Sequence, residues 1–132
     1  MSNVDTVKEI YAAFGRGDVP AILDHLDQNV EWETTTEVPG VPWLAPRHGK
    51  ANVPGFFESL APLQITRFEP RTFFAADGDK VFVIIHFEAD HNGKHYTIPN
   101  NGHLWEFGAD GKVVRYDHIT DTATHQRLAG GE

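Results

Sequence analysis

Residues 80–120 read KVFVIIHFEADHNGKHYTIPNNGHLWEFGADGKVVRYDHIT, and this stretch decides the fold. Asn92-Gly93 is a strong signal for a two-residue hairpin turn, and Ala109-Asp110-Gly111 marks a second turn. The segments between the turns are rich in β-branched and aromatic residues, as strands are. The pattern therefore predicts an antiparallel meander with strands over Lys80–Ala89, His95–Phe107 and Lys112–Thr120.

The meander extends toward the N-terminus. The segment Ile65–Ala76 is a further predicted strand, and Pro70 within it implies a bulge or a sheet edge. Residues 30–36 alternate and contain three threonines, which predicts another strand. A loop rich in proline and glycine follows this strand up to about residue 48.

Helices occupy the remaining parts of the chain. Val4, Val7, Tyr11 and Phe14 form one apolar stripe at helical spacing. A second helix follows Asp18, a residue type that caps helix N-termini. Further helices are predicted over residues 49–60, with Pro54 making the start uncertain, and over about 121–128. Helices ahead of a strand meander indicate a single α+β domain over residues 1–132, with its helices on one face of a curved sheet.

The composition excludes some binding partners and some chemistries. The 132 residues carry a formal charge of −8 and no cysteine, which excludes disulfides and thiolate chemistry and disfavours nucleic acid, whose partners need a basic face. The N-terminus has no secretory pattern, and no apolar run reaches the ~20 residues of a membrane span. We therefore expect a cytoplasmic protein that does not interact with membranes.

Three stretches resemble a known superfamily: residues 11–22 (YAAFGRGDVPAI) followed by Val30-Glu31-Trp32, His48-Gly49-Lys50 leading into Phe56-Phe57, and residues 103–107 (HLWEF) with Asp121-Thr122. Together they are similar to the SnoaL-like branch of the nuclear transport factor 2 (NTF2-like) superfamily. That superfamily includes ketosteroid isomerase, polyketide cyclase, limonene epoxide hydrolase and scytalone dehydratase.

This resemblance implies an NTF2-like cone, in which a curved antiparallel or mixed sheet carries three helices from the N-terminal half on its concave face. It also implies one pocket for a small, largely apolar ligand or substrate, and a homodimer packed through the outer face of the sheet. Cofactors are not expected.

Two reactions of the superfamily fit the residues poorly. Thr34 stands where the isomerase has its catalytic base, and His103 stands where the isomerase has a protonated aspartate. The tyrosine of that site falls at Ile10, one residue before Tyr11. The epoxide hydrolase triad of an arginine between two aspartates is also incomplete. The sequence therefore argues against both reactions.

Asp121 and His103 are the expected catalytic residues. An aspartate at the end of the last strand faces the pocket in the related cyclases and hydrolases, and a histidine held by a carboxylate is a competent acid or base near pH 7. Asp121 precedes an apolar helical run, however, so it is equally suited to cap the last helix. The sequence leaves both roles open.

Further side chains are expected to contact the ligand: Trp32, Thr34, Tyr11, Trp43, His48 and Asn101. The sequence does not show which of His86 and His118 faces the pocket. Asp117 and His118 are adjacent on a strand, so at most one of them does. His91 and His95 flank a turn without a third ligand, and no metal site is predicted.

The acidic composition and the lack of an obvious apolar recognition loop do not favour a third class, a protein-interaction module like the transport factor, which the sequence leaves open. Two function classes are favoured. One is a cofactor-independent lyase, isomerase or hydrolase, working by acid/base chemistry as a cyclase, dehydratase, hydratase or hydrolase. The alternative is a non-catalytic protein that binds a small ligand in the same pocket. Neither the substrate nor the reaction type can be read from the sequence.

Overall fold

The elements of the computed structural model, which describes residues 2–35 and 37–130, follow the expected order of helices before a meander. They are α1 (Asn3–Gly15), α2 (Val19–Leu23), β1 (Leu26–Trp32), η1 (Pro42–Leu44), β2 (Arg47–His48), η2 (Lys50–Asn52), α3 (Pro54–Ser59), β3 (Gln64–Ala76), β4 (Lys80–His91), β5 (Lys94–Phe107), β6 (Val113–Ile119) and α4 (Thr122–Gly130).

All six strands form one mixed sheet in the order β2-β1-β6-β5-β4-β3. β1 pairs with β6 in parallel, and the other pairings are antiparallel. Asn92 and Gly93 join β4 to β5 with positive φ angles of 52° and 77°, as a type I′ hairpin turn requires. The expected meander is therefore confirmed.

The sheet is curved, and breaks in its register contribute to the curvature. The pairing of β3 with β4 shifts at two places, one of them between Pro70 and Thr72, and the pairing of β4 with β5 shifts between Ile85 and Phe87. Such bulges bend a strand and increase its twist. β3 is also an edge strand, so Pro70 lies at both a bulge and an edge.

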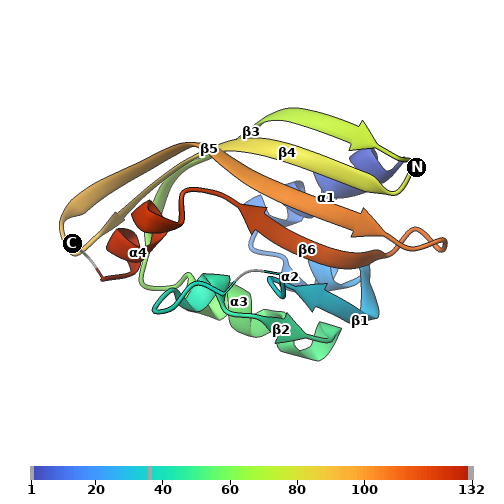
Figure 1. Ribbon diagram of the computed structural model, residues 1–132, viewed down its shortest axis with the longest axis horizontal. Helices are drawn as coiled ribbons and strands as arrows, with labels where there is room; N and C mark the ends of the chain where they lie inside the picture. Colours follow the sequence, from blue (N-terminus) through green and yellow to red (C-terminus); the bar gives the residue numbers. More distant parts are fainter. Residues whose placement is uncertain (1, 36, 131–132) are drawn as a thin grey trace.

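The core lies between the concave face of the sheet and the helices. On β4, Val81, Val83, Ile85 and Phe87 are buried against it in strict alternation. Figure 1 shows α1 behind β3 and β4, with α2 and α3 near β1 and β2. α1 carries the expected stripe, with Val7 and Ile10 buried. The α+β class, with helices on the concave face, is confirmed.

Most element boundaries lie within two residues of the expectation, and two elements differ more. β1 spans Leu26–Trp32 rather than residues 30–36, because Glu33 has a φ of 61° and leaves the extended conformation; Thr36, the expected end, lies outside the described residues. The helix expected over residues 49–60 is divided into η2 and α3, because Pro54 lacks an N–H group and begins a new helix at its N-terminus.

Candidate functional site

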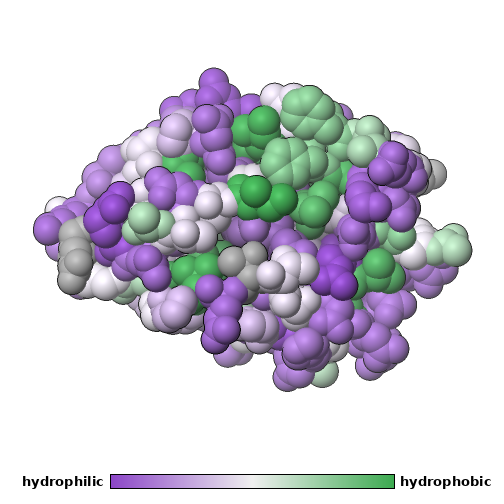
Figure 2. Space-filling model, viewed as in Figure 1, coloured by the Kyte–Doolittle hydropathy of each residue, from purple (hydrophilic) through white to green (hydrophobic). Residues whose placement is uncertain are grey.

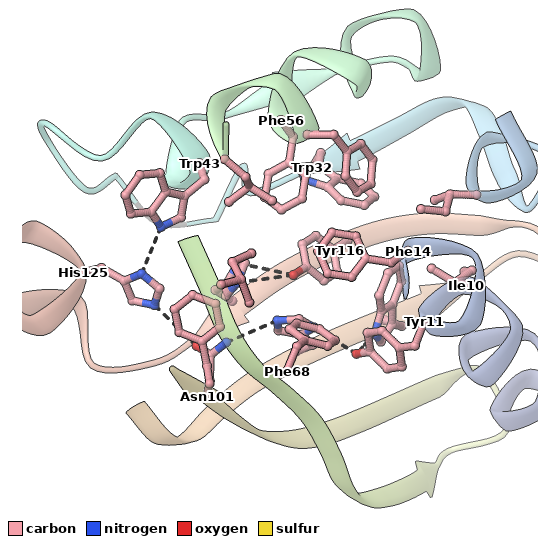
Figure 3. A pocket seen from close by; sticks show the side chains of 18 residues that line it. Ile10, Tyr11, Phe14, Trp32, Trp43, Phe56, Phe68, Asn101, Tyr116 and His125 are labelled. Atoms are coloured by element: carbon pink, nitrogen blue, oxygen red, sulfur yellow. Dashed lines mark hydrogen bonds between the residues drawn. The ribbon is translucent and has the colours of Figure 1, made fainter. Parts of the chain in front are cut away.

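A cavity lies between the concave face of the sheet and helices α1, α2 and α3 (Figure 3). Its empty volume is about 600 Å³ when the solvent at its open mouth is included. Aromatic and aliphatic side chains form most of its wall. Polar groups are supplied by Tyr11, Asn101, His103, Tyr116, His118 and His125.

The register of the sheet places an aromatic row on one wall of the cavity. Tyr116 on β6 pairs with Trp32 on β1 and with Trp105 on β5. The ring centroids are 4.2 Å apart for Trp32 and Tyr116, and 4.4 Å apart for Trp105 and Tyr116. None of the three is more than 2% exposed. Such tightly packed rings provide a rigid apolar surface for a ligand.

Two histidines form the next row. His103 on β5 pairs with His118 on β6, and their ring centroids lie 4.5 Å apart. Residues two apart on a strand share a face, so both histidines point to the same side as the aromatic row. Burial, followed by the charges of His118 and His125, holds the pKa of His103 well below its ordinary value. His103 is therefore neutral near pH 7.

Glu33 is the partner of His118. Its Oε2 contacts His118 Nδ1, and its Oε1 accepts a hydrogen bond of 2.7 Å from the backbone N–H of His118. The left-handed backbone at Glu33 costs a non-glycine residue ~1 kcal/mol, and a bond of 2.7 Å from its N–H to the Tyr116 carbonyl holds it in place. The two side chains are only 5% (Glu33) and 7% (His118) exposed. Strained backbone of this kind is concentrated at functional sites.

Tyr116 continues this cluster. Its hydroxyl lies 3.3 Å from Nδ1 and 3.4 Å from Nε2 of His118. An ionised carboxylate only accepts hydrogen bonds, so Nδ1 carries the proton that faces Glu33. Nε2 then carries no hydrogen, and the Tyr116 hydroxyl lies beside it. Burial, followed by Glu33, raises the pKa of Tyr116, so this phenol stays protonated.

A second set of polar side chains crosses the cavity as a chain (Figure 3). Its successive contacts are Trp43 Nε1 to His125 Nδ1 at 3.0 Å, His125 Nε2 to Asn101 Oδ1 at 3.4 Å, Asn101 Nδ2 to His103 Nε2 at 3.5 Å, His103 Nδ1 to Tyr11 Oη at 2.8 Å and Tyr11 Oη to Trp105 Nε1 at 3.0 Å. Burial raises the pKa of Tyr11 and lowers that of His125 to about 3. The chain is therefore uncharged at neutral pH.

Five of the side chains expected at the site line this cavity, namely Tyr11, Trp32, Trp43, Asn101 and His103. They come from α1, β1, η1 and β5, and the fold brings them together from distant parts of the sequence. The remaining expected residues, Thr34, His48 and Asp121, lie outside the lining.

Asp121 caps the last helix. Its Oδ1 accepts from the Thr124 backbone N–H at 3.0 Å, and its Oδ2 accepts from the Thr124 hydroxyl at 2.7 Å. These bonds, the side-chain bond first, lower the pKa of Asp121, and the residue is exposed. The expected pair of Asp121 and His103 is therefore not formed, because the carboxylate is turned to the start of α4 and His103 contacts Tyr11 and Asn101 instead.

Thr34 and His48 have other partners. Thr34 Oγ1 accepts from Arg115 Nη1 at 3.3 Å. His48 pairs with Glu31 at 2.8 Å, where its side chain is 70% exposed. Thr34 was expected within the strand over residues 30–36, but β1 ends at Trp32, so strand alternation does not place Thr34 on the face of Trp32.

Glu33, Tyr116 and His125 also belong to the site but were not predicted from the sequence, which left the orientation of His118 open. Strand alternation places Glu33 on the face opposite Trp32, and only its positive φ turns it toward His118. Alternation along β6 did give a usable signal, since Tyr116 and His118 lie two residues apart on the face of the cavity.

The histidines of the β4–β5 hairpin have separate partners. His91 Nδ1 lies 2.7 Å from the Leu128 carbonyl, and His95 Nδ1 lies 2.5 Å from Asp90. Within residues 2–35 and 37–130, no group of three or more histidine, aspartate and glutamate side chains is arranged to hold a metal ion.

The fold is that of a known class. Residues 7–116 match the SnoaL-like domain, and the chain belongs to this family. It is similar to an NTF2-like protein from Burkholderia pseudomallei K96243, with 29% identity over 98% of each chain and a TM-score of 0.81. It is also similar to TerC, which was co-crystallized with polyporic acid, with 26% identity over 97% of this chain and 98% of TerC and a TM-score of 0.80.

A provisionally assigned polyketide cyclase from Xanthomonas campestris pv. campestris shares the fold, with 19% identity over 96% of each chain and a TM-score of 0.74. The sequence matches none of the curated proteins with which it was compared. No helix in the described part of the chain is long and apolar enough to span a membrane.

Proposed function

We propose that this SnoaL-like protein binds a small, largely apolar molecule in the cavity and catalyses cofactor-free proton transfer on it, as a cyclase, dehydratase, hydratase or hydrolase does. The observation that carries the proposal is the buried contact between Glu33 and His118 at the cavity wall. Buried charges are costly unless they are paired, and a carboxylate–histidine pair beside an apolar cavity is suited to acid/base catalysis.

The roles follow from the geometry. Glu33 holds the Nδ1–H of His118 and fixes the orientation of the ring. Nε2 of His118 then takes a proton from the bound molecule and returns it at a later step. The aromatic row of Trp32, Tyr116 and Trp105 binds the apolar body and keeps water away. Loss of water strengthens the electrostatic interactions in the site.

The alternative is a binding protein without catalysis, in which Glu33 and His118 only satisfy one another. The co-crystallization of TerC with polyporic acid supports binding of a small organic molecule by this fold, and it does not distinguish the two functions. The pair of Glu33 and His118 favours the enzyme, because an apolar binding site has no need of a buried carboxylate.

A proton-exchange experiment distinguishes an enzyme from a binding protein without catalysis. Aryl methyl ketones such as 2-acetylnaphthalene are incubated with the protein in D₂O, and deuterium in the methyl group is measured by mass spectrometry. We expect exchange that is lost in Glu33→Gln and in His118→Gln. Glu31→Gln and His48→Gln are matched controls, because they alter an exposed pair of the same chemistry. Tight binding of the ketones without exchange would favour the binding protein.

We also propose a homodimer formed through the outer face of the sheet. Figure 2 shows hydrophobic side chains gathered over β3, β4 and β5 on this face. Phe74 is 48% exposed and lies beside Phe82, and Ile119 is 56% exposed. Large exposed apolar patches mark association sites, and a second copy that presents the same patch would bury it.

A further inference from the structure

The polar chain across the cavity ends in an indole N–H group on either side. Trp43 contacts His125 at one end, and Trp105 contacts Tyr11 at the other. An indole N–H can only donate a hydrogen bond. Because both ends are obligatory donors, the hydrogen atoms of the chain have to be arranged so that no two donors face each other.

From the Trp43 end, the arrangement of His125 is determined. Its Nδ1 accepts the Trp43 N–H at 3.0 Å. A pKa of about 3 keeps the ring neutral at pH 7, and a neutral imidazole has one donor and one acceptor nitrogen. Nε2 of His125 therefore carries the hydrogen, which it donates to Asn101 Oδ1 at 3.4 Å or to Thr120 Oγ1 at 3.2 Å.

This donor fixes the orientation of the Asn101 amide. If the amide were flipped, its NH₂ group would face the N–H of His125, and two donors would meet. Oδ1 therefore faces His125, and Nδ2 donates to Nε2 of His103 at 3.5 Å. His103 is also neutral, so its hydrogen is on Nδ1, which faces Tyr11 Oη at 2.8 Å.

Tyr11 accepts hydrogen bonds from both directions of the polar chain. Its oxygen accepts from Nδ1–H of His103 and from Nε1–H of Trp105 at 3.0 Å. Its own hydrogen is not used by the chain. If Tyr11 instead donated to His103, the hydrogen of His103 would be on Nε2 and would face the NH₂ group of Asn101.

We propose that Trp43 and Trp105 are positioning residues that set the direction of this chain, so that the Tyr11 hydroxyl donates its hydrogen to an acceptor oxygen of the ligand. The ligand class is an apolar molecule with a carbonyl or anionic oxygen. The ligand class rests on the proposed function. The predicted tautomers of His103 and His125 do not depend on it.

Trp32 supports the same ligand class independently. It lines the cavity, and its buried Nε1–H has no hydrogen-bond partner among the described residues. Buried donors without a partner are rare and call for an explanation. Together with Tyr11 it gives the wall a second donor without an acceptor, which an oxygen of the ligand can satisfy. Because burial raises the pKa of Tyr11, its hydroxyl keeps the proton it donates.

The first test is the tautomeric state of the histidines in the unliganded protein. ¹⁵N-labelled histidine rings are observed by long-range ¹H–¹⁵N NMR at pH 7. We expect His103 with its hydrogen on Nδ1 and His125 with its hydrogen on Nε2. The opposite tautomer at either ring, or a protonated ring, would overturn the proposal.

The second test removes the indole donor at the Trp43 end of the hydrogen-bonded side chains. In Trp43→Phe no indole donates to His125, so the hydrogen bonds between His125 and Tyr11 can reverse. The Tyr11 hydroxyl then donates to Nδ1 of His103, and we expect part of the His103 population to carry its hydrogen on Nε2. Trp32→Phe is the matched control, since its indole is outside the chain. Folding of both variants is checked by their backbone amide spectra. An unchanged His103 in folded Trp43→Phe would show that Trp43 does not set the direction.

The third test concerns the ligand. Affinities for 2-acetylnaphthalene and 2-ethylnaphthalene, which differ in the carbonyl group, are compared by calorimetry. We expect Tyr11→Phe to lower the ratio of ketone to hydrocarbon affinity roughly three- to tenfold, the effect of one hydrogen bond. An unchanged ratio would overturn the role of Tyr11. If neither compound binds while the tautomers are as expected, the ligand class and the proposed function fail and the hydrogen-bond direction stands.

Discussion

His103 on β5 and His118 on β6 are paired directly across the sheet, and their ring centroids lie 4.5 Å apart in the cavity wall. Their surroundings differ. His118 contacts the Glu33 carboxylate, whereas His103 contacts the uncharged groups of Tyr11 and Asn101. Under the proposed function, His118 moves protons and His103 transmits a hydrogen bond.

The buried histidines predict a loss of stability in mild acid. In the unfolded chain His125 has a pKa near 6.5, whereas burial lowers it to about 3 in the folded protein. Between these values the unfolded state binds more protons than the folded state. The free energy of unfolding therefore decreases as the pH is lowered. For His125 the loss from pH 7 to pH 5 is about 2 kcal/mol. Urea titrations at both pH values should show a smaller loss in His125→Gln, and an equal loss would contradict the assignment.

Asp121 is predicted to act on stability and not on the ligand. Asp121→Ala removes a helix cap and should cost about 1 kcal/mol of unfolding free energy. Asp121→Asn should keep most of that energy, since asparagine caps nearly as well. Ketone exchange and binding should be unchanged in both variants. A large loss of exchange in stably folded Asp121→Asn would restore the catalytic role that the sequence left open.

The difference between Asp121 and Glu33 shows how far the sequence could predict the site. Hairpin turns and apolar periodicity are local patterns, and they predicted the α+β class. The cone followed from the resemblance to the superfamily, and five of the expected site residues line its cavity. The same Asp-Thr pattern fits a cap and a catalytic position equally well, so Asp121 could not be assigned. Glu33 depends on a positive φ and on contacts with residues more than 80 positions away, and no local pattern indicates either.

The proposed homodimer predicts that a single charge on the outer face separates the protomers. Phe74→Glu places a carboxylate in the apolar patch, where pairing would bury it without a partner. Light scattering after gel filtration should give the mass of a dimer for the native protein and of a monomer for Phe74→Glu. Gln28→Glu adds the same charge at an exposed site of β1 and should leave the dimer intact. A native monomer would refute the proposal.

The two glutamate–histidine pairs at the end of β1 allow a direct comparison of burial. Glu31 pairs with His48 at the surface, and Glu33 pairs with His118 in the interior. Removing one partner of a buried pair costs ~3–5 kcal/mol, although in Glu33→Gln the amide oxygen can still accept a hydrogen bond, so we expect about 2–3 kcal/mol. Glu31→Gln should cost less than ~1 kcal/mol, as exposed pairs do. Denaturant unfolding at pH 7 measures both, and similar costs would mean that burial adds nothing to the Glu33 pair.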